Sequence, residues 1–497
     1  MLDSLETRPH PGCGRAGVLA LSVLLGACAV GPDYKPPQLP TPDEWHSQPQ
    51  TGVRPDSADS PTLASWWTVL NDPTLNQLID RALAENKTVK QAMARVVESR
   101  ARRSISSAAF WPTVGASASA SRSDSDRGTG AGSGSGPDFS FDGNETHDAG
   151  LDAGWEIDLF GGNRRALEAS TAQLGASEAD LRDVLITLLG DVTLSYVNVR
   201  TTQSRLTYAE RNLESQREVV EITGWRADAG LATVLDVEQA KSSYAQTEAA
   251  LPSLESNLAA AKNRLAVLTG QQPGTLEALL TQRKAIPVAP VEIVASVPAD
   301  VMRRRPDIRS AERRLAAQTA QVGVATAQLY PSLSLSGSIG VTAGSSGDLL
   351  SDALQSNRYG LSLNMPIFRA GELRQNIKAQ NALVDQALAS YEETVLAAYE
   401  EVENALTDWI NEQRRHQSLL DAAASARIAS ELALVQYNSG LVDFQTVLTA
   451  DRQLISTEDA LAVSDGELTS NLVRLYKALG GGWSVFPPAA TAAAGGQ

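Results

Sequence analysis

Few residues of this sequence are spaced in a way that could carry out covalent chemistry. His46, His147 and His416 are far apart in the chain, and none has the neighbours of a zinc site. The glycine- and serine-rich run at 128–136 lacks the Lys-Ser/Thr pair of a phosphate-binding loop, and the chain contains no nucleophile elbow. The sequence therefore predicts a protein that is not an enzyme and that needs neither a metal nor another cofactor.

Charge also narrows the class of partner. The chain has 58 acidic and 42 basic residues, a net charge of −16, which argues against binding to nucleic acid. Arg303–Arg305 form a local basic run that could bind an anion or nucleic acid. Asp307 and Glu312 follow closely, so packing at the start of a helix is the favoured interpretation of this run.

Cys13 and Cys28 are the only cysteines, which excludes a disulfide framework. Arg15 precedes a short apolar run at 16–27 that is too brief to cross a bilayer and is typical of a secretory signal. We therefore expect residues 1–27 to be a signal peptide.

The end of this run predicts one covalent modification. Leu25-Gly26-Ala27-Cys28 resembles the bacterial lipobox, in which the signal is cut before the cysteine and the new N-terminal cysteine is acylated. Cys28 is thus the expected lipidation site, carrying palmitate. The alternative is an ordinary signal with a chance cysteine. Ala29 in place of aspartate points to the outer membrane by resemblance to sorted lipoproteins.

Two long helices are expected to position the other elements of the chain. From Glu372 to Asn438 the chain has 67 residues without proline or glycine, at spacings that suit a helix. At 1.5 Å per residue this helix is about 100 Å long. A second long helix is expected at about 163–226, where leucines and valines recur every seven residues, as in helices packed as coiled coils.

Short segments of alternating apolar and polar residues predict strands. In the clearest one, Leu151, Trp155 and Leu159 alternate with Asp152 and Asp158. The expected strands lie at about 113–122, 148–159, 332–342 and 359–367.

The pattern occurs twice, which indicates a tandem duplication. Phe110-Trp111-Pro112 corresponds to Leu329-Tyr330-Pro331, and Ala229-Gly230-Leu231 to Ser439-Gly440-Leu441. Each half holds a helix of about 22 residues, two strands, a long helix and a returning helix. The expected divisions are an extended lipidated tether at 28–62, a first repeat at 63–286 with its returning helix at 233–268, a linker at 287–298, a second repeat at 299–482 with helices at about 371–438 and 443–477, and a tail at 483–497.

Four strands with one apolar face each suit the wall of a transmembrane barrel, but four strands cannot close. An open edge is not tolerated in lipid, so several chains would have to share one barrel. The alternation by itself also fits a soluble, half-buried sheet. Helix length, duplication and the lipid signal favour the barrel.

Several motifs resemble the outer-membrane efflux channel proteins of the TolC type, and in particular their lipoprotein branch. They are the lipobox, Trp66-Trp67, Arg305-Pro306-Asp307-Ile308-Arg309 with Ala311-Glu312, and Val322-Gly323-Val324-Ala325. The resemblance covers essentially all of the mature chain. It implies a mainly α fold with a membrane β-barrel: a homotrimer that shares twelve strands and forms a periplasmic helical tunnel. The tunnel would meet a periplasmic adaptor and an inner-membrane pump of the RND, MFS or ABC class.

The resemblance also assigns roles to the turns at the far ends of the long helices. In the family this tip is the closed end and the place where the adaptor docks. The residues carried over as docking candidates are Gly230, Leu231, Gly440 and Leu441.

Asp443 follows the second of these turns, and its counterpart after the first turn is Thr233. Threefold symmetry would make Asp443 a ring of three carboxylates that attracts cations and gates the tip. Aspartate is also a favoured N-cap, so Asp443 has a purely structural alternative. Asp236 and Asp451 are weaker gate candidates, interpreted as solvated helix acids.

The resemblance favours an exit duct for a tripartite efflux system that carries toxic compounds or drugs out of the cell. An exit duct for type I protein secretion has the same architecture. A trimeric coiled-coil scaffold without a lumen is the third possibility.

Overall fold

The computed structural model describes residues 29–40, 42, 44–47, 53–55, 65–123, 144–287, 293–295, 304–351 and 353–482. The expected signal peptide, Cys28 and the tail at 483–497 lie outside the described residues. The chain forms two compact units, and each unit draws on both sequence repeats. Unit 1 comprises 1–36, 98–175 and 313–389, and unit 2 comprises 37–97, 176–312 and 390–497.

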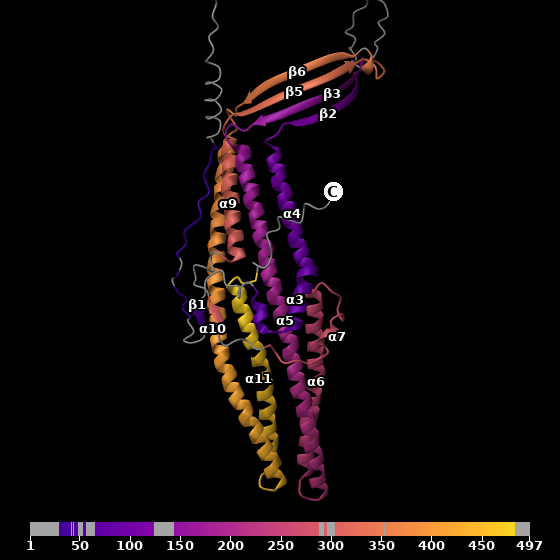
Figure 1. The fold of residues 1–497 in the computed structure, drawn as a ribbon, viewed down its shortest axis with the longest axis vertical. Coiled ribbons are helices and arrows are strands. Elements are labelled where there is room, and N and C mark those ends of the chain that lie inside the picture. Colours follow the sequence, from indigo (N-terminus) through magenta and orange to yellow (C-terminus); the bar gives the residue numbers. More distant parts are fainter. Residues whose placement is uncertain are drawn as a thin grey trace, which may run out of the picture. The chain divides into compact units, whose positions relative to one another are not determined.

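Unit 1 contains a four-stranded antiparallel sheet (Figure 1). Its strands follow the order β2-β3-β5-β6, so that each sequence repeat contributes one hairpin. The side chains of β2 and β6 are exposed on both faces. The strands are β2 (Thr113–Ser123), β3 (Asn144–Ile157), β5 (Ser332–Ala343) and β6 (Leu354–Asn364).

Two strand predictions were shifted along the chain. The strand expected at 148–159 spans Asn144–Ile157, and the one expected at 359–367 spans Leu354–Asn364. Pairing sets these ends, because Asn144 pairs with Ser123 and Leu354 with Thr342. At the other end, β5 starts at Ser332 opposite Asn364, directly after Pro331. Proline has no N–H to donate to a β-sheet, so β6 has no pairing partner beyond Asn364. The alternation of apolar and polar residues nevertheless continues to Ile367.

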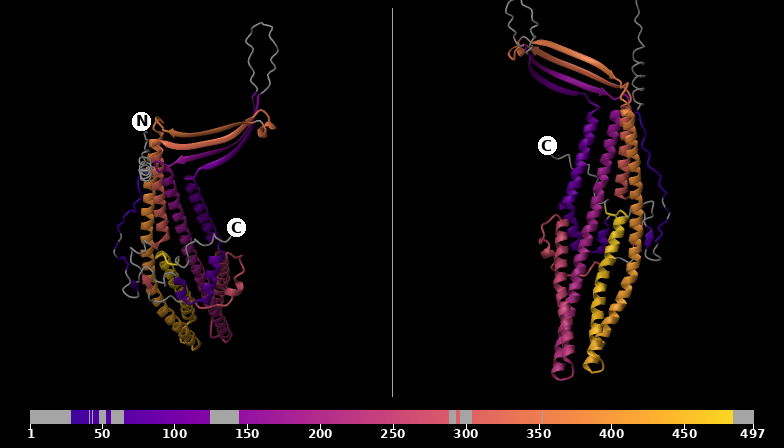
Figure 2. Two further views of the ribbon diagram at one scale, coloured as in Figure 1. Left: turned by 45° about the horizontal axis from the view of Figure 1, so that its top comes forward. Right: turned by 180° about the vertical axis from the view of Figure 1, so that it is seen from behind.

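The helices confirm the duplication through equal lengths in the two repeats. They are α4 (Lys87–Ala108) and α9 (Pro306–Ala327) with 22 residues each, α5 (Gly162–Asp228) and α10 (Glu372–Asn438) with 67 each, and α6 (Val234–Leu268) and α11 (Phe444–Ala478) with 35 each. In unit 2, the hairpins α5–α6 and α10–α11 lie side by side in both views of Figure 2. No helix in the described ranges is both long enough and apolar enough to span a bilayer.

The main hydrophobic core belongs to unit 2. Short elements flank the long helices there: η1 (Trp66–Leu70), α3 (Pro73–Glu85) and α7 (Glu277–Leu280). Trp66 is 1% exposed, stacks on Tyr476 of α11 at 5.7 Å between ring centroids and meets Trp67 edge-on at 6.1 Å. The Trp66-Trp67 pair therefore fills the core between η1 and α11.

A buried polar network crosses this core. Asp72 is the N-cap of α3 and accepts hydrogen bonds from the amides of Thr74 and Leu75. Its second carboxylate oxygen accepts a 2.5 Å hydrogen bond from the Tyr196 hydroxyl of α5. Arg200 donates to that hydroxyl at 3.0 Å and to the carbonyl oxygen of Gln282 at 2.8 Å. The network thus ties the start of α3 and the segment after α7 to the long helix.

This network predicts a loss of stability at alkaline pH. Burial and the hydrogen bond to Asp72 raise the pKa of Tyr196 to about 12 from its ordinary value of 10.0. The folded chain therefore retains the phenol proton more tightly than the unfolded chain does, and this contribution is complete below pH 10 and falls as the pH rises toward 12. Unfolding measured from pH 9 to 12 should show the decline in the wild type. A Tyr196→Phe variant should lack this part of the decline, and an identical pH profile would contradict the assignment.

The expected tether and linker are more structured than the sequence suggested. β1 (Val53–Pro55), within the expected tether at 28–62, pairs in parallel with β4 (Ile293–Ala295), within the expected linker at 287–298. Residues 29–33, directly after the expected lipidation site, pack against the helices of unit 1. The expected tether therefore contacts other segments of the chain at these two places. A proline-rich composition indicates extended backbone, but it does not show which surface that backbone contacts.

Candidate functional site

The two turns that link the long helices to their returning helices have the same geometry. Gly230 and Gly440 have φ of +73° and +72°, in the left-handed region that favours glycine. The amide of Leu231 donates to the carbonyl of Arg226 at 2.7 Å, and the amide of Leu441 donates to that of Gln436 at 2.9 Å. Together with a second bond from each glycine amide, these form the Schellman cap that ends a helix. The docking candidates are therefore the C-caps of α5 and α10.

The residues that follow are the N-caps of the returning helices. Thr233 forms a capping box with Asp236: the Asp236 amide donates to the Thr233 hydroxyl at 3.2 Å, and the Thr233 amide donates to Asp236 at 2.9 Å. Asp443 accepts from the amide of Thr446 at 2.9 Å and from its hydroxyl at 2.7 Å. These bonds hold the pKa of Asp443 below its ordinary value of 3.8, so this exposed side chain is ionised at neutral pH. Asp443 is therefore the N-cap of α11, as the structural alternative predicted.

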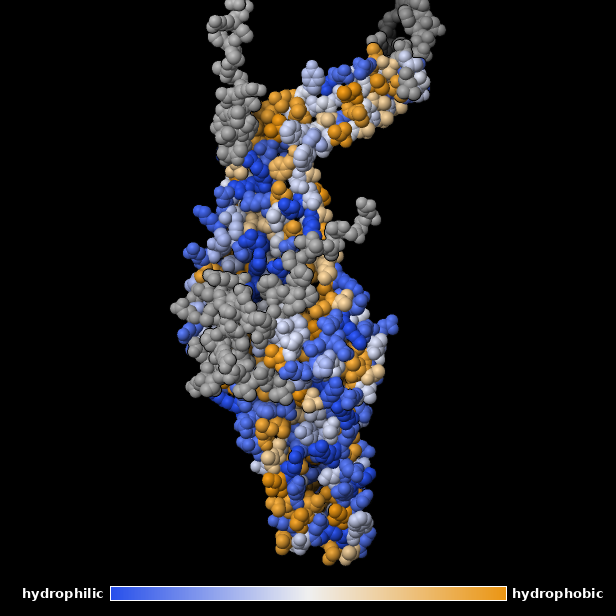
Figure 3. Space-filling view, in the orientation of Figure 1, coloured by the Kyte–Doolittle hydropathy of each residue, from blue (hydrophilic) through white to orange (hydrophobic). Residues whose placement is uncertain are grey.

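Apolar side chains gather around these turns on the exposed surface (Figure 3). Charged residues would be expected on a surface that only meets water, so this end of unit 2 has the composition of a contact surface. The exposed members are Trp225, Leu231, Val234, Leu235, Ile428, Leu432, Val435 and Leu441. We call this set the tip patch.

Packing fixes the two turns against each other within unit 2. Tyr437 and Phe444 meet edge-on at 5.5 Å in a small core that also contains Ala240, and so joins α6 to α10 and α11. Arg226 lies 4.5 Å from the ring centroid of Tyr437 and donates to the carbonyl of Asn438 at 2.9 Å. Sequence reasoning missed Arg226, because a basic residue in the last turn of a helix is common and does not reveal its partner.

Above the turns, polar residues join α5 to the second hairpin. Gln216 of α5 donates to Asp451 of α11 at 2.9 Å, and Asn212 donates to Glu458 at 3.3 Å. Arg427 of α10 also donates to Glu458 at 2.7 Å. Burial raises the pKa of the Asp451 carboxyl, while the bond from Gln216 opposes this rise. The interpretation of Asp451 as a solvated helix acid was therefore wrong, because heptad position does not show which helix face a second hairpin covers.

The remaining candidates have structural partners. Arg305 contacts Asp307 and Glu401 at 2.7 Å each and the carbonyl of Ala478 at 2.7 Å, which agrees with packing at a helix start. His416 lies 2.6 Å from Asp465. In the described ranges, no three His, Cys, Asp or Glu residues are grouped so that they could hold a metal ion.

The sequence model of the outer membrane efflux protein family matches the chain twice, at residues 78–271 and 297–481. The chain belongs to this family. The first match lies within the first repeat, and the second begins at the end of the expected linker and covers nearly all of the second repeat. Two separate matches of one family model agree with a tandem duplication.

Known relatives extend over almost the whole chain. Nodulation protein T of Rhizobium leguminosarum bv. viciae is 33% identical over 474 residues, which cover 95% of this chain and 94% of the relative. The solvent efflux pump outer membrane protein SrpC of Pseudomonas putida is 30% identical, with 93% and 97% covered. Among solved structures, the outer-membrane channel OprN matches with a TM-score of 0.79 and 38% identity, covering 92% of this chain and all of OprN.

These findings confirm the expected fold class, mainly α-helical with a membrane β-barrel and a tandem duplication. The protein is an outer-membrane efflux channel, not an enzyme, and members of the family work as passive ducts without a cofactor.

Proposed function

We propose that three copies of this chain share one barrel and form the exit duct of a tripartite efflux system. The open sheet carries this proposal. β2 and β6 are its two edges, and their side chains are exposed on both faces. Such edges need partners in lipid, and three copies of a four-stranded sheet give a twelve-stranded barrel, within the range of known barrels.

In this proposal a periplasmic adaptor docks on the tip patch, with contacts at Gly230, Leu231, Gly440 and Leu441. Both turns present an exposed leucine next to a rigid Schellman cap, which offers the adaptor a preformed apolar surface. An inner-membrane pump of the RND, MFS or ABC class supplies the energy, since the duct is passive.

Small organic compounds are the proposed cargo. Relatives are named for the efflux of solvents and toluene and for the export of pyoverdine. A deletion strain should become more susceptible to solvents, dyes and antibiotics, and its set of secreted proteins should stay unchanged. Loss of a secreted protein with unchanged susceptibility would instead support the type I secretion duct. A purified protein that conducts under no condition would support the scaffold.

We further propose that the chain is made with a signal peptide at 1–27 and is anchored by palmitate on Cys28. A Cys28→Ser variant should lose all incorporation of labelled palmitate. Because the barrel closes through strands of neighbouring copies, the assembled oligomer should persist in this variant. Persistent labelling would contradict the lipidation site, and loss of the oligomer would contradict closure through strands alone.

Asp443 is proposed to form a carboxylate ring at the closed tip, with Thr233 as its uncharged counterpart. Asparagine caps a helix about as well as aspartate, whereas alanine costs about 1 kcal/mol at an N-cap. Asp443→Asn therefore removes the charge and retains the cap. In planar bilayers, Asp443→Asn should already raise the single-channel conductance and reduce cation preference. If only Asp443→Ala changes the current, the residue is a cap and not a gate.

A further inference from the structure

The first described residues of the chain are held on unit 1 by one buried arginine. Arg165, in the first turn of α5, has a side chain that is 6% exposed. Its guanidinium donates to the carbonyl of Val30 at 3.2 Å, to that of Gly31 at 3.3 Å and to the carboxylate of Asp33 at 2.6 Å. A fourth bond, to Glu168 at 2.8 Å, fixes the arginine on its own helix. One side chain thus binds three acceptors, on Val30, Gly31 and Asp33. We call residues 29–33 the N-terminal strap.

Close backbone contacts accompany these hydrogen bonds. A Cβ on Gly323 of α9 would lie 2.7 Å from Cγ of Arg165 and 2.8 Å from its Cδ, so only glycine leaves room for the arginine. A Cβ on Gly31 would lie 2.5 Å from Cα of Gly323, and Gly31 has φ of +94°. The strap therefore lies directly on the backbone of α9, at a distance that side chains on either glycine would prevent.

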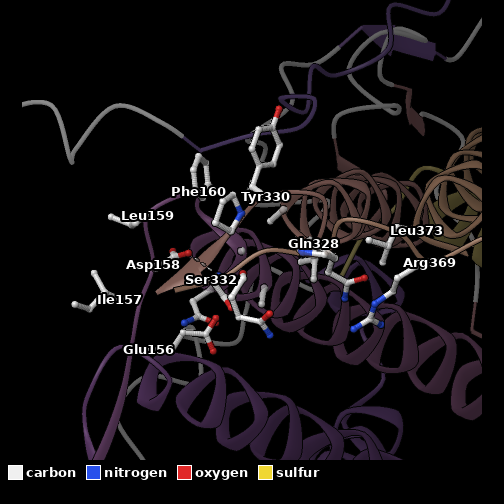
Figure 4. A pocket seen from close by; sticks show the side chains of 18 of the residues that line it. Glu156, Ile157, Asp158, Leu159, Phe160, Gln328, Tyr330, Ser332, Arg369 and Leu373 are labelled. Atoms are coloured by element: carbon white, nitrogen blue, oxygen red, sulfur yellow. Dashed lines mark hydrogen bonds between the residues drawn. The ribbon is translucent and has the colours of Figure 1, made fainter. Parts of the chain in front are cut away.

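The strap meets the sheet at a strand-to-helix junction. The amide of Val30 donates to the carbonyl of Phe160 at 3.1 Å, and Phe160 stacks on Tyr330 with ring centroids 4.8 Å apart. Figure 4 shows these two rings next to each other at a cavity of about 590 Å³. Tyr330 and Phe160 border β5 and β3, and aromatic residues also border the other two strands: Trp111 before β2 and Phe368 after β6, both exposed.

Girdles of aromatic residues at the ends of barrel strands mark the boundary between lipid and water, and Tyr and Trp suit it because an apolar ring carries one polar O–H or N–H group. The strap therefore docks at the level of the membrane boundary of unit 1. Cys28 is joined to Ala29 by one peptide bond, so an acyl group on Cys28 would be attached close to this boundary.

We propose that the N-terminal strap docks on unit 1 and is held there by Arg165, which occupies the space left by Gly323. This contact fixes the N-terminal end of the mature chain beside the end of the barrel at which β3 ends and β5 begins. Arg165 is a positioning residue in this role. The consequence for the lipid rests on the proposed acylation of Cys28: its acyl chains would enter the leaflet next to β3 and β5 and would not swing on a free tether. The docking itself does not depend on acylation.

Proteolysis of the purified full-length protein tests the strap without any added label. Chymotrypsin can cleave after Tyr34, whose half-buried ring lies 5.8 Å from the guanidinium of Arg313. Cleavage there requires local opening, so its rate reports how often the strap leaves its site. Mass spectrometry of the intact chain detects the loss of the N-terminal fragment.

We expect Arg165→Ala and Gly323→Ala to raise the rate of cleavage after Tyr34 at least tenfold. Arg165→Lys should lie between these variants and the wild type, because an ammonium group cannot reach all three acceptors in one plane. Arg103→Ala is the matched control: Arg103 is an exposed arginine of unit 1 that donates to Thr171. Its cleavage rate should equal that of the wild type, and the thermal midpoints of all variants should stay close together.

Two results would overturn the proposal. One is a wild-type rate as high as that of a free peptide of residues 29–40, and the other is an unchanged rate in both Arg165→Ala and Gly323→Ala. A Cys28→Ser chain should show the same protection as the wild type. Failure of acylation and failure of docking are therefore separate outcomes.

Discussion

Replacing Arg200 by alanine should lower the free energy of unfolding by about 3–5 kcal/mol. Arg200 is completely buried and is the cation of the network that holds Asp72 and Tyr196. Its removal takes away the positive charge that acts on the buried Asp72 carboxylate, and it also frees the carbonyl of Gln282. Denaturation of the purified protein in detergent, followed by circular dichroism, measures the loss.

Arg205 provides the matched control for this substitution. It lies about one turn along the same helix and pairs with Asp459 through two hydrogen bonds, but its side chain is 31% exposed. Water can replace much of that interaction, so Arg205→Ala should cost about 1 kcal/mol or less. Equal losses for the two variants would show that burial of the network does not determine its contribution.

Trp66→Ala should have a similarly large effect, about 3–5 kcal/mol, because it opens a cavity in the main core of unit 2. The indole is 1% exposed and contacts both Trp67 and Tyr476. A Cβ on Gly482 would come within 3.2 Å of its Nε1, so the backbone after α11 closes tightly over the ring. That backbone has little freedom to collapse into the space left by alanine.

Thermal unfolding should show the difference between this tryptophan and an exposed one. Trp225, in the tip patch, is 67% exposed, and Trp225→Ala should change the stability of a single chain by less than about 0.5 kcal/mol. If Trp66→Ala unfolds at the wild-type temperature, the packing around η1 does not hold unit 2 together. A large effect of Trp225→Ala would instead indicate that the tip patch is already covered in the oligomer.

Features set by local sequence were predicted well. The span of α10, Glu372–Asn438, agrees to within one residue with the helix expected at about 371–438, because a glycine precedes it and another follows shortly after its end. Thr233 and Asp443 were placed at the starts of α6 and α11, where they act as caps. The duplication was also visible, since two copies of one pattern in the same chain need no structure to be compared.

Features set by contacts between distant segments required the tertiary structure. The end of β6 depends on where β5 begins, and the hydrogen-bond donor to Asp451 is Gln216, which lies 235 residues away in the chain. Arg165 appears in the sequence as one more basic residue at a helix start, and its contact with Asp33 lies across 132 residues. Helix propensity, capping and turn chemistry act within a few residues and can be read along the chain. The partner of a buried polar group is fixed only when the packing of whole elements decides which side chains exclude water together.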